Sequence, residues 1–152
     1  MAPDDTREWQ SGAFCVTFIL REVFLSMASF ILLGAIGLAG ALGAVARYLL
    51  SRFIAERVPS PFPLGTFIIN ISGAFLIGLV FALTTKKVLA PPTQSIIATG
   101  FMGGFTTFST LNWETVQLGR SGYTTLGSLY LGGTYALGLC AVILGILLGQ
   151  VL

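Results

Sequence analysis

The fold depends most on one stretch of the sequence, Gly100-Phe-Met-Gly-Gly-Phe-Thr-Thr-Phe-Ser-Thr110, which lies inside an apolar segment long enough to cross a membrane. Three glycines and a cluster of hydroxyl side chains interrupt that segment. Lipid hydrocarbon offers no water to freed N–H and C=O groups, so non-helical backbone at that depth must be buried in protein or face a wet cavity. Two half-helices that meet at such a break bring dipole ends and loose carbonyls together. The stretch therefore predicts a broken helix with an ion site, or alternatively a glycine kink whose hydroxyls bond to their own helix.

The composition of the chain is typical of a membrane protein. Of its 152 residues, 55% are hydrophobic and 9% are charged, and the mean hydropathy is +0.89, whereas soluble domains carry roughly a quarter charged residues. At ~20 residues per span, the apolar stretches fit about four transmembrane helices. We expect an all-α membrane protein with spans over about 28–50, 64–83, 93–118 and 125–152, the third of them broken. The sequence has no histidine, which excludes a histidine metal site and a Ser/His hydrolase.

Residues 1–26 differ from the rest of the chain. They begin with a polar segment of mixed charge, and Arg21 and Glu22 interrupt the apolar run that follows. Acidic residues before that run argue against a signal peptide. We expect residues 1–26 to be an N-terminal extension, either interfacial or dispensable with Met27 as the natural start, and residues 27–152 to form the transmembrane domain.

Small and polar residues inside the expected spans predict how the helices meet. Gly34, Gly37, Gly40 and Gly43 recur at every third position, which predicts close helix packing. Asn70 is the strongly polar residue of the second span, and leaving its amide unpaired would cost a few kcal/mol. Its partner is either another helix, through an interhelical hydrogen bond, or a permeating ion.

The basic residues of the loops are evenly divided between the two sides of the membrane. With a cytoplasmic N-terminus, four would lie inside and four outside, namely Arg7, Arg21, Lys86 and Lys87 against Arg47, Arg52, Arg57 and Arg120. Orientation normally follows an excess of Lys and Arg, so the chain could insert both ways. A dual-topology protein can pair with an inverted copy of itself.

Three segments of the sequence resemble the Fluc/CrcB fluoride channel family. They are Gly43-Ala-Val-Ala-Arg-Tyr48, Pro63-Leu-Gly-Thr-Phe-Ile-Ile-Asn-Ile-Ser-Gly73, and the stretch 100–110 together with Glu114. The resemblance covers about residues 28–152. It implies a small four-helix protein of the bacterial plasma or inner membrane, an antiparallel dual-topology homodimer, two fluoride pores per dimer and a central structural sodium ion.

The resemblance also implies roles for individual residues. Asn70 is similar to the pore asparagine, and Phe108 to the first phenylalanine of the pore's aromatic box. The second box phenylalanine falls at Leu111, a departure from the family pattern. The backbone carbonyls of Gly103 and Thr106, from both subunits, are expected to hold the sodium. We further expect a larger residue at Gly103 to disrupt this site, because it would place a Cβ where only glycine fits.

Other family positions lie further along the chain. Tyr130 and Thr134 resemble the start of a track of hydroxyl groups, and Gly138 stands where a third hydroxyl would be expected. Arg47 and Glu114 match positions near the pore mouth.

The chemistry of the residues agrees with an anion pathway. Fluoride is strongly hydrated, so a conducting site must replace its water with donors, such as the Asn70 amide and the hydroxyls of Ser109 and Thr110. The edge of the Phe108 ring carries partial positive charge. A buried sodium ion would raise the potential for anions nearby. The spans contain no ring of Asp or Glu, which argues against a cation pathway.

Several other functions compete with a passive, electrogenic fluoride channel that exports cytoplasmic fluoride. A small dual-topology, proton-coupled multidrug exporter would need a membrane-embedded carboxylate, for which Glu114 is the sole candidate. A non-transporting assembly subunit could be held together by the glycine faces. An enzyme is not expected, since paired carboxylates and an activated nucleophile are not visible.

Overall fold

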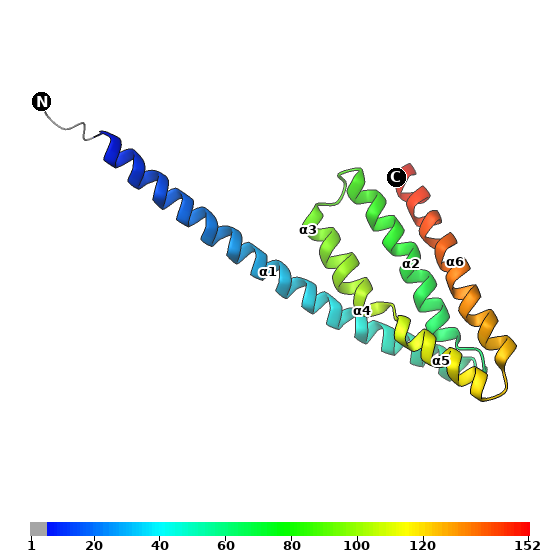
Figure 1. The fold of residues 1–152 in the computed structure, drawn as a ribbon. Coiled ribbons are helices and arrows are strands. Elements are labelled where there is room, and N and C mark those ends of the chain that lie inside the picture. The colour runs from blue at the N-terminus through cyan, green and yellow to red at the C-terminus, as the bar shows by residue number, and fades with distance from the viewer. Residues whose placement is uncertain (1–5) are drawn as a thin grey trace, which may run out of the picture. The chain divides into compact units, whose positions relative to one another are not determined.

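The structure is a computed structural model, and it describes residues 6–152, with side chains from residue 27 onward. The described residues form helices and their connections, as an all-α membrane protein requires (Figure 1). In chain order the helices are α1 (Thr6–Arg57), α2 (Leu64–Thr85), α3 (Pro91–Gln94), the π-helix η1 (Ser95–Met102), α4 (Gly103–Phe105), α5 (Phe108–Arg120) and α6 (Thr124–Val151).

The chain divides into two compact units, Met1–Gly34 and Ala35–Leu152. The described backbone of the first unit belongs to α1, which is continuous at Met27. The side chains of residues 6–26 lie outside the described part, and so does the interfacial role expected of them. The division into an extension, 1–26, and a transmembrane domain, 27–152, therefore stays a prediction. Apart from the first residues of the Met27–Arg57 span, the features below belong to the second unit.

Three helical segments of the described chain are long and apolar enough to cross a membrane. They are Met27–Arg57 within α1, with 31 residues, α2 with 22 and α6 with 28. The expected third span is not one helix, because the chain from Pro91 to Arg120 is divided into α3, η1, α4 and α5. Figure 1 shows α2 and α6 side by side and a change of direction between α4 and α5.

The break lies at two threonines. α4 ends at Phe105, the backbone is extended at Thr106 (φ −79°, ψ 158°) and Thr107 (φ −151°, ψ 116°), and α5 begins at Phe108. The predicted break within 100–110 is thus confirmed, but its glycines do not make it: Gly103 is helical, with φ −60° and ψ −37°. The π-helix that precedes the break is a rare form that occurs frequently at functional sites.

The glycines of the broken segment instead permit close packing against α1. A Cβ on Gly104 would overlap the carbonyl oxygen of Gly40, and one on Gly43 would overlap that of Phe101. The predicted contact face of the first span is therefore confirmed at Gly40 and Gly43. At Gly37 a Cβ would meet no heavy atom of the described chain within 4 Å.

α2 and α6 also meet at glycines. A Cβ on Gly78 would overlap the carbonyl oxygen of Val142, and one on Gly145 would overlap that of Phe75. Such contacts require small residues, as in other membrane helix pairs. They hold α2 beside α6, so Asn70 of α2 and Thr134 of α6 can line one cavity next to the break.

Candidate functional site

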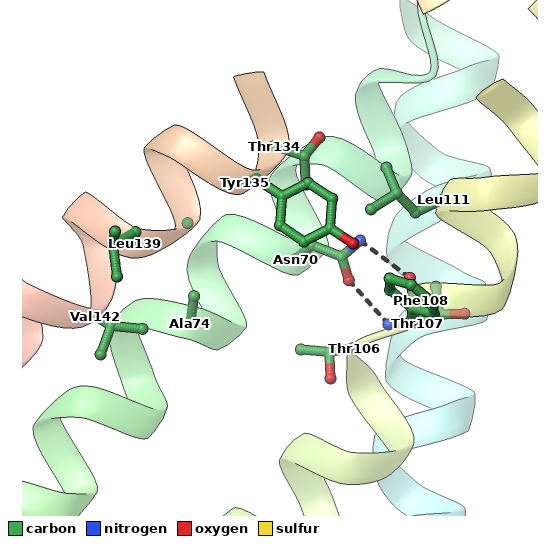
Figure 2. Close-up of a pocket in the computed structure, with 11 residues that line it drawn as sticks. Asn70, Ala74, Thr106, Thr107, Phe108, Leu111, Thr134, Tyr135, Leu139 and Val142 are labelled. Atoms are coloured by element: carbon green, nitrogen blue, oxygen red, sulfur yellow. Dashed lines mark hydrogen bonds between the residues drawn. The ribbon is translucent and has the colours of Figure 1, made fainter. Parts of the chain in front are cut away.

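Asn70 on α2 is bonded to the break through both ends of its amide. Its Nδ2 donates to the carbonyl of Thr107 at 3.1 Å, and its Oδ1 accepts from the Thr107 N–H at 2.8 Å (Figure 2). Asn70 therefore makes the interhelical hydrogen bond considered from the sequence. An amide nitrogen carries two N–H groups, so a second donor remains for another partner.

The hydroxyl groups after the break form a cluster at the start of α5. Thr107 is the N-cap, and its Oγ1 accepts from the Thr110 N–H at 3.3 Å. The same oxygen lies 2.9 Å from Thr110 Oγ1 and 3.3 Å from Ser109 Oγ. An N-cap of this kind stabilises a helix start, where the helix dipole favours negative charge. Ser109 and Thr110, predicted as anion donors, thus lie together.

A cavity of about 420 Å³, here the Asn70 cavity, lies between α2, the break, α5 and α6 (Figure 2). It brings together the predicted residues Asn70, Phe108 and Thr134, along with Thr106. Its complete lining is Asn70, Ala74, Thr106, Thr107, Phe108, Leu111, Thr134, Tyr135, Gly138, Leu139 and Val142.

The aromatic wall of the Asn70 cavity has one expected ring and one unexpected ring. Phe108 is 65% exposed, and its ring meets Tyr135 edge-on, with centroids 6.5 Å apart and planes at 70°. Leu111, in place of the second phenylalanine, is buried at 4% exposure and packs with Leu118 and Tyr130. The cavity wall at position 111 is therefore aliphatic and anchored in the core.

The expected hydroxyl track is engaged in internal hydrogen bonds. Tyr130 is fully buried, lies outside the Asn70 cavity and donates to Glu114 Oε2 at 2.6 Å. Glu114 Oε1 accepts from the Thr66 hydroxyl at 3.0 Å. Thr134 lines the Asn70 cavity, yet its hydroxyl donates to the Tyr130 carbonyl at 2.6 Å. Gly138 lines the cavity without a hydroxyl.

Arg47 and Glu114 line separate cavities. The Arg47 cavity, about 290 Å³, is lined by Ala44, Arg47, Tyr48, Ser51, Thr66, Ile69, Thr107 and Thr110. None of these residues is acidic, and Arg47 is half-buried there. Glu114 instead lines a cavity of about 190 Å³ beneath the connection from α1 to α2. Thr107 lines both the Arg47 cavity and the Asn70 cavity.

The carbonyls of Gly103 and Thr106 do not accept the hydrogen bonds that a continuous α-helix would give them. The N–H four residues after Gly103 is that of Thr107, which donates to Asn70 Oδ1. The N–H four residues after Thr106 is that of Thr110, which donates to Thr107 Oγ1. Neither carbonyl oxygen is therefore used by the donor that a continuous α-helix would supply, and hard cations are bound by oxygen ligands such as these.

The expected reason for glycine at position 103 is wrong for the single chain. Gly103 has ordinary helical angles, and a Cβ there would meet no heavy atom of the described chain within 4 Å. It is Gly104 whose missing Cβ allows contact with Gly40. Any steric demand at Gly103 must come from outside the described chain.

Sequence reasoning missed three residues of the site. Thr107 bonds Asn70 and caps α5, and the pattern of a hydroxyl residue followed by a helix could have indicated the cap. Tyr135 and Thr66 gave no comparable signal, because their roles depend on how α6 and α2 are rotated against α5.

Comparison with known proteins identifies the family of this chain. The family model described as CrcB-like protein, Camphor Resistance (CrcB), matches residues 34–146. The chain is 44% identical over 116 residues to the Fluoride-specific ion channel FluC of Acidobacterium capsulatum, covering 76% of this chain and 93% of that protein. It is 41% identical over 117 residues to FluC of Aquifex aeolicus, covering 76% of this chain and 94% of that one. The chain therefore belongs to the CrcB family of membrane proteins, the family that its sequence resembles.

Proposed function

We propose that this chain forms a fluoride-selective channel that lets fluoride leave the cell passively and so confers fluoride resistance. Its relatives in Acidobacterium capsulatum and Nitratidesulfovibrio vulgaris are named fluoride-specific ion channels, and the match covers 93% and 94% of their lengths. The observation that carries the proposal is the Asn70 amide, which is fixed at the break with a second N–H to donate and lines the same cavity as the exposed Phe108 ring.

The donors around the break suit a small, strongly hydrated anion. The second N–H of Asn70 and the hydroxyls of Ser109 and Thr110 can replace water around fluoride. The polarised edge of Phe108 and the N-terminus of α5 add favourable potential. Arg47, in a cavity that shares Thr107 with the Asn70 cavity, would attract the anion to this end of the pathway. Tyr130, Thr134 and Glu114 would support the opposite wall through their hydrogen bonds.

The finer architecture that we propose has four spans, with the segment from Pro91 to Arg120 as a third span broken mid-membrane. Two copies would insert in opposite orientations and pair as an antiparallel homodimer, in line with the even division of basic residues. The exposure of Phe108 and Gly103 supports a second copy over this face, because both carry predicted functions and neither is enclosed by its own chain.

We also include a structural sodium ion at the dimer centre. The carbonyls of Gly103 and Thr106, doubled by the partner, would supply four neutral oxygens, and both lack their usual helical donors in the described chain. When bound, the ion would link the two copies and add positive potential near the anion path. No side-chain carboxylate is required at such a site.

Flux from liposomes tests the function. Purified protein in vesicles loaded with potassium fluoride should release fluoride rapidly when valinomycin carries the compensating potassium, with no requirement for a proton gradient. Vesicles loaded with potassium chloride should release little chloride. Fluoride release that requires a proton gradient, or equal release of both halides, would contradict a selective passive channel. The second candidate, the proton-coupled multidrug exporter, would release no fluoride in this assay and would instead exchange protons for its own substrate.

A further inference from the structure

The side chain of Asn70 takes up the backbone N–H and C=O of Thr107 at the break. In an uninterrupted helix, the Thr107 N–H would donate to the Gly103 carbonyl four residues earlier. Here it donates to Asn70 Oδ1 at 2.8 Å, while the Thr107 carbonyl accepts from Asn70 Nδ2 at 3.1 Å. Asn70 therefore acts as a substitute for helical hydrogen bonding at this point of the chain, from 37 residues away.

We infer that Asn70 is a positioning residue for the cation site as well as an anion donor, and that it couples the two sites. The inference rests on the cation site of the proposed function. Because Asn70 Oδ1 accepts the Thr107 N–H, that N–H does not donate to the Gly103 carbonyl. The Gly103 carbonyl oxygen is then free to bind a cation. The remaining Asn70 N–H is left for the anion, because Asn70 lines the same cavity as Phe108, and the acceptor and donor ends of one amide would then serve different ions.

The two ends of the amide can be separated by substitution. Asn70→Asp keeps an oxygen to accept the Thr107 N–H but loses the second N–H in either protonation state. It should abolish fluoride flux and keep the sodium midpoint at or below that of wild type, because the acceptor is retained and an ionised carboxylate attracts the cation. Asn70→Leu, of similar size, loses both ends. The Thr107 N–H can then return to the Gly103 carbonyl and compete with sodium there.

The measurement is thermal stability of the purified dimer against sodium concentration, with a large organic cation making up the ionic strength. In wild type the melting temperature should rise with sodium, as binding to the folded state requires. In Asn70→Leu the sodium concentration at the midpoint of this rise should increase by about tenfold or more. The reason is that sodium must displace one hydrogen bond from the Thr107 N–H to the Gly103 carbonyl in each of the two subunits. Asn70→Ser, a milder change that also cannot reach the break, should behave alike.

Two controls separate a specific effect from general destabilisation. Leu118→Ala removes buried volume from the cluster with Tyr130 and should lower the melting temperature at every sodium concentration with an unchanged midpoint. Ser72→Ala removes a hydroxyl that bonds its own helix at the Ile69 carbonyl and should change neither quantity.

Several outcomes would overturn the inference. An unchanged sodium midpoint in Asn70→Leu and Asn70→Ser would do so, and so would failure of both variants to assemble at saturating sodium. A wild type indifferent to sodium after its exhaustive removal would remove the cation site and this inference together. Fluoride flux of the wild type reports on the channel function separately, so the failure of one is distinguishable from the failure of the other.

Discussion

The hydroxyl of Tyr130 lies 2.6 Å from Glu114 Oε2, and Thr66 donates to the other carboxylate oxygen at 3.0 Å. This contact joins α5 to α6, and the bond from Thr66 adds α2. The two donors stabilise this half-buried carboxylate, because hydrogen bonds to a charged group are among the stronger ones. Glu114 thus has a structural role, joining three helices, that does not require it to exchange a proton.

Tyr130→Phe should destabilise the protein by about 1–3 kcal/mol, because it leaves Glu114 Oε2 without its donor while keeping the ring in place. Thermal unfolding in detergent measures this loss. Phe62, which contacts the Tyr130 ring edge-on at 5.3 Å, should be undisturbed. Tyr123→Phe is the matched control, since this exposed tyrosine lies at the start of α6, and it should be neutral. Equal stability of Tyr130→Phe and wild type would contradict the hydrogen-bond role.

Glu114→Gln should retain fast fluoride flux. The amide can still accept from Thr66 or Tyr130 through its oxygen, and a passive channel does not need an exchangeable proton. Vesicle efflux of fluoride measures the outcome, with protein-free vesicles as background. Complete loss of fluoride flux from a folded Glu114→Gln protein would contradict this expectation and would mean that conduction requires the carboxylate.

Phe108→Ile should lower fluoride flux by at least about tenfold, the factor that corresponds to losing ~1.4 kcal/mol of stabilisation of the ion by the ring edge. The substitution keeps an apolar side chain at an exposed position, so folding should be unaffected. Phe81→Ile provides the control, because Phe81 is also exposed but lies on α2 outside the Asn70 cavity. Equal flux from the two variants would mean that the Phe108 ring has no special role.

Leu111→Phe tests how this chain tolerates the missing second ring. Leu111 is buried yet also lines the Asn70 cavity, so only part of the larger ring can extend into open volume while the rest crowds the packed core. We expect flux equal to or above that of wild type, with a stability loss of about 1–3 kcal/mol from overpacking. Leu118→Phe, buried in the same cluster but not in the cavity lining, should show the stability loss alone. A folded but non-conducting Leu111→Phe protein would mean that the pathway is built around leucine.

The sequence allowed the break to be predicted within 100–110, because hydroxyl residues and glycines inside an apolar span are unusual. It did not allow the break to be assigned to Thr106 and Thr107. That position involves Asn70 on another helix, which accepts the Thr107 N–H in place of a carbonyl of the same helix. Local patterns also could not distinguish Gly103, which is exposed, from Gly104, which packs on Gly40. Both glycines occur in the same motif, and only the approach of α1 separates their roles.

Gly104→Ala and Gly103→Ala should therefore have opposite consequences for the single chain. At Gly104 the added methyl would overlap the carbonyl oxygen of Gly40, so α1 must move, and we expect a loss of about 1–3 kcal/mol or more. At Gly103 the methyl enters open space on a helical backbone, where alanine is up to ~1 kcal/mol more favourable than glycine.

The same pair of variants tests whether a second copy of the chain lies against Gly103. If a partner lies against Gly103 in the membrane, Gly103→Ala should fold normally yet dimerise more weakly, as measured by the concentration dependence of crosslinking in vesicles. Gly104→Ala should lower stability and dimerisation together. If Gly103→Ala dimerises fully and depends on sodium as wild type does, the partner does not lie against Gly103. The exposure of Gly103 would then no longer support a cation at the centre of the dimer.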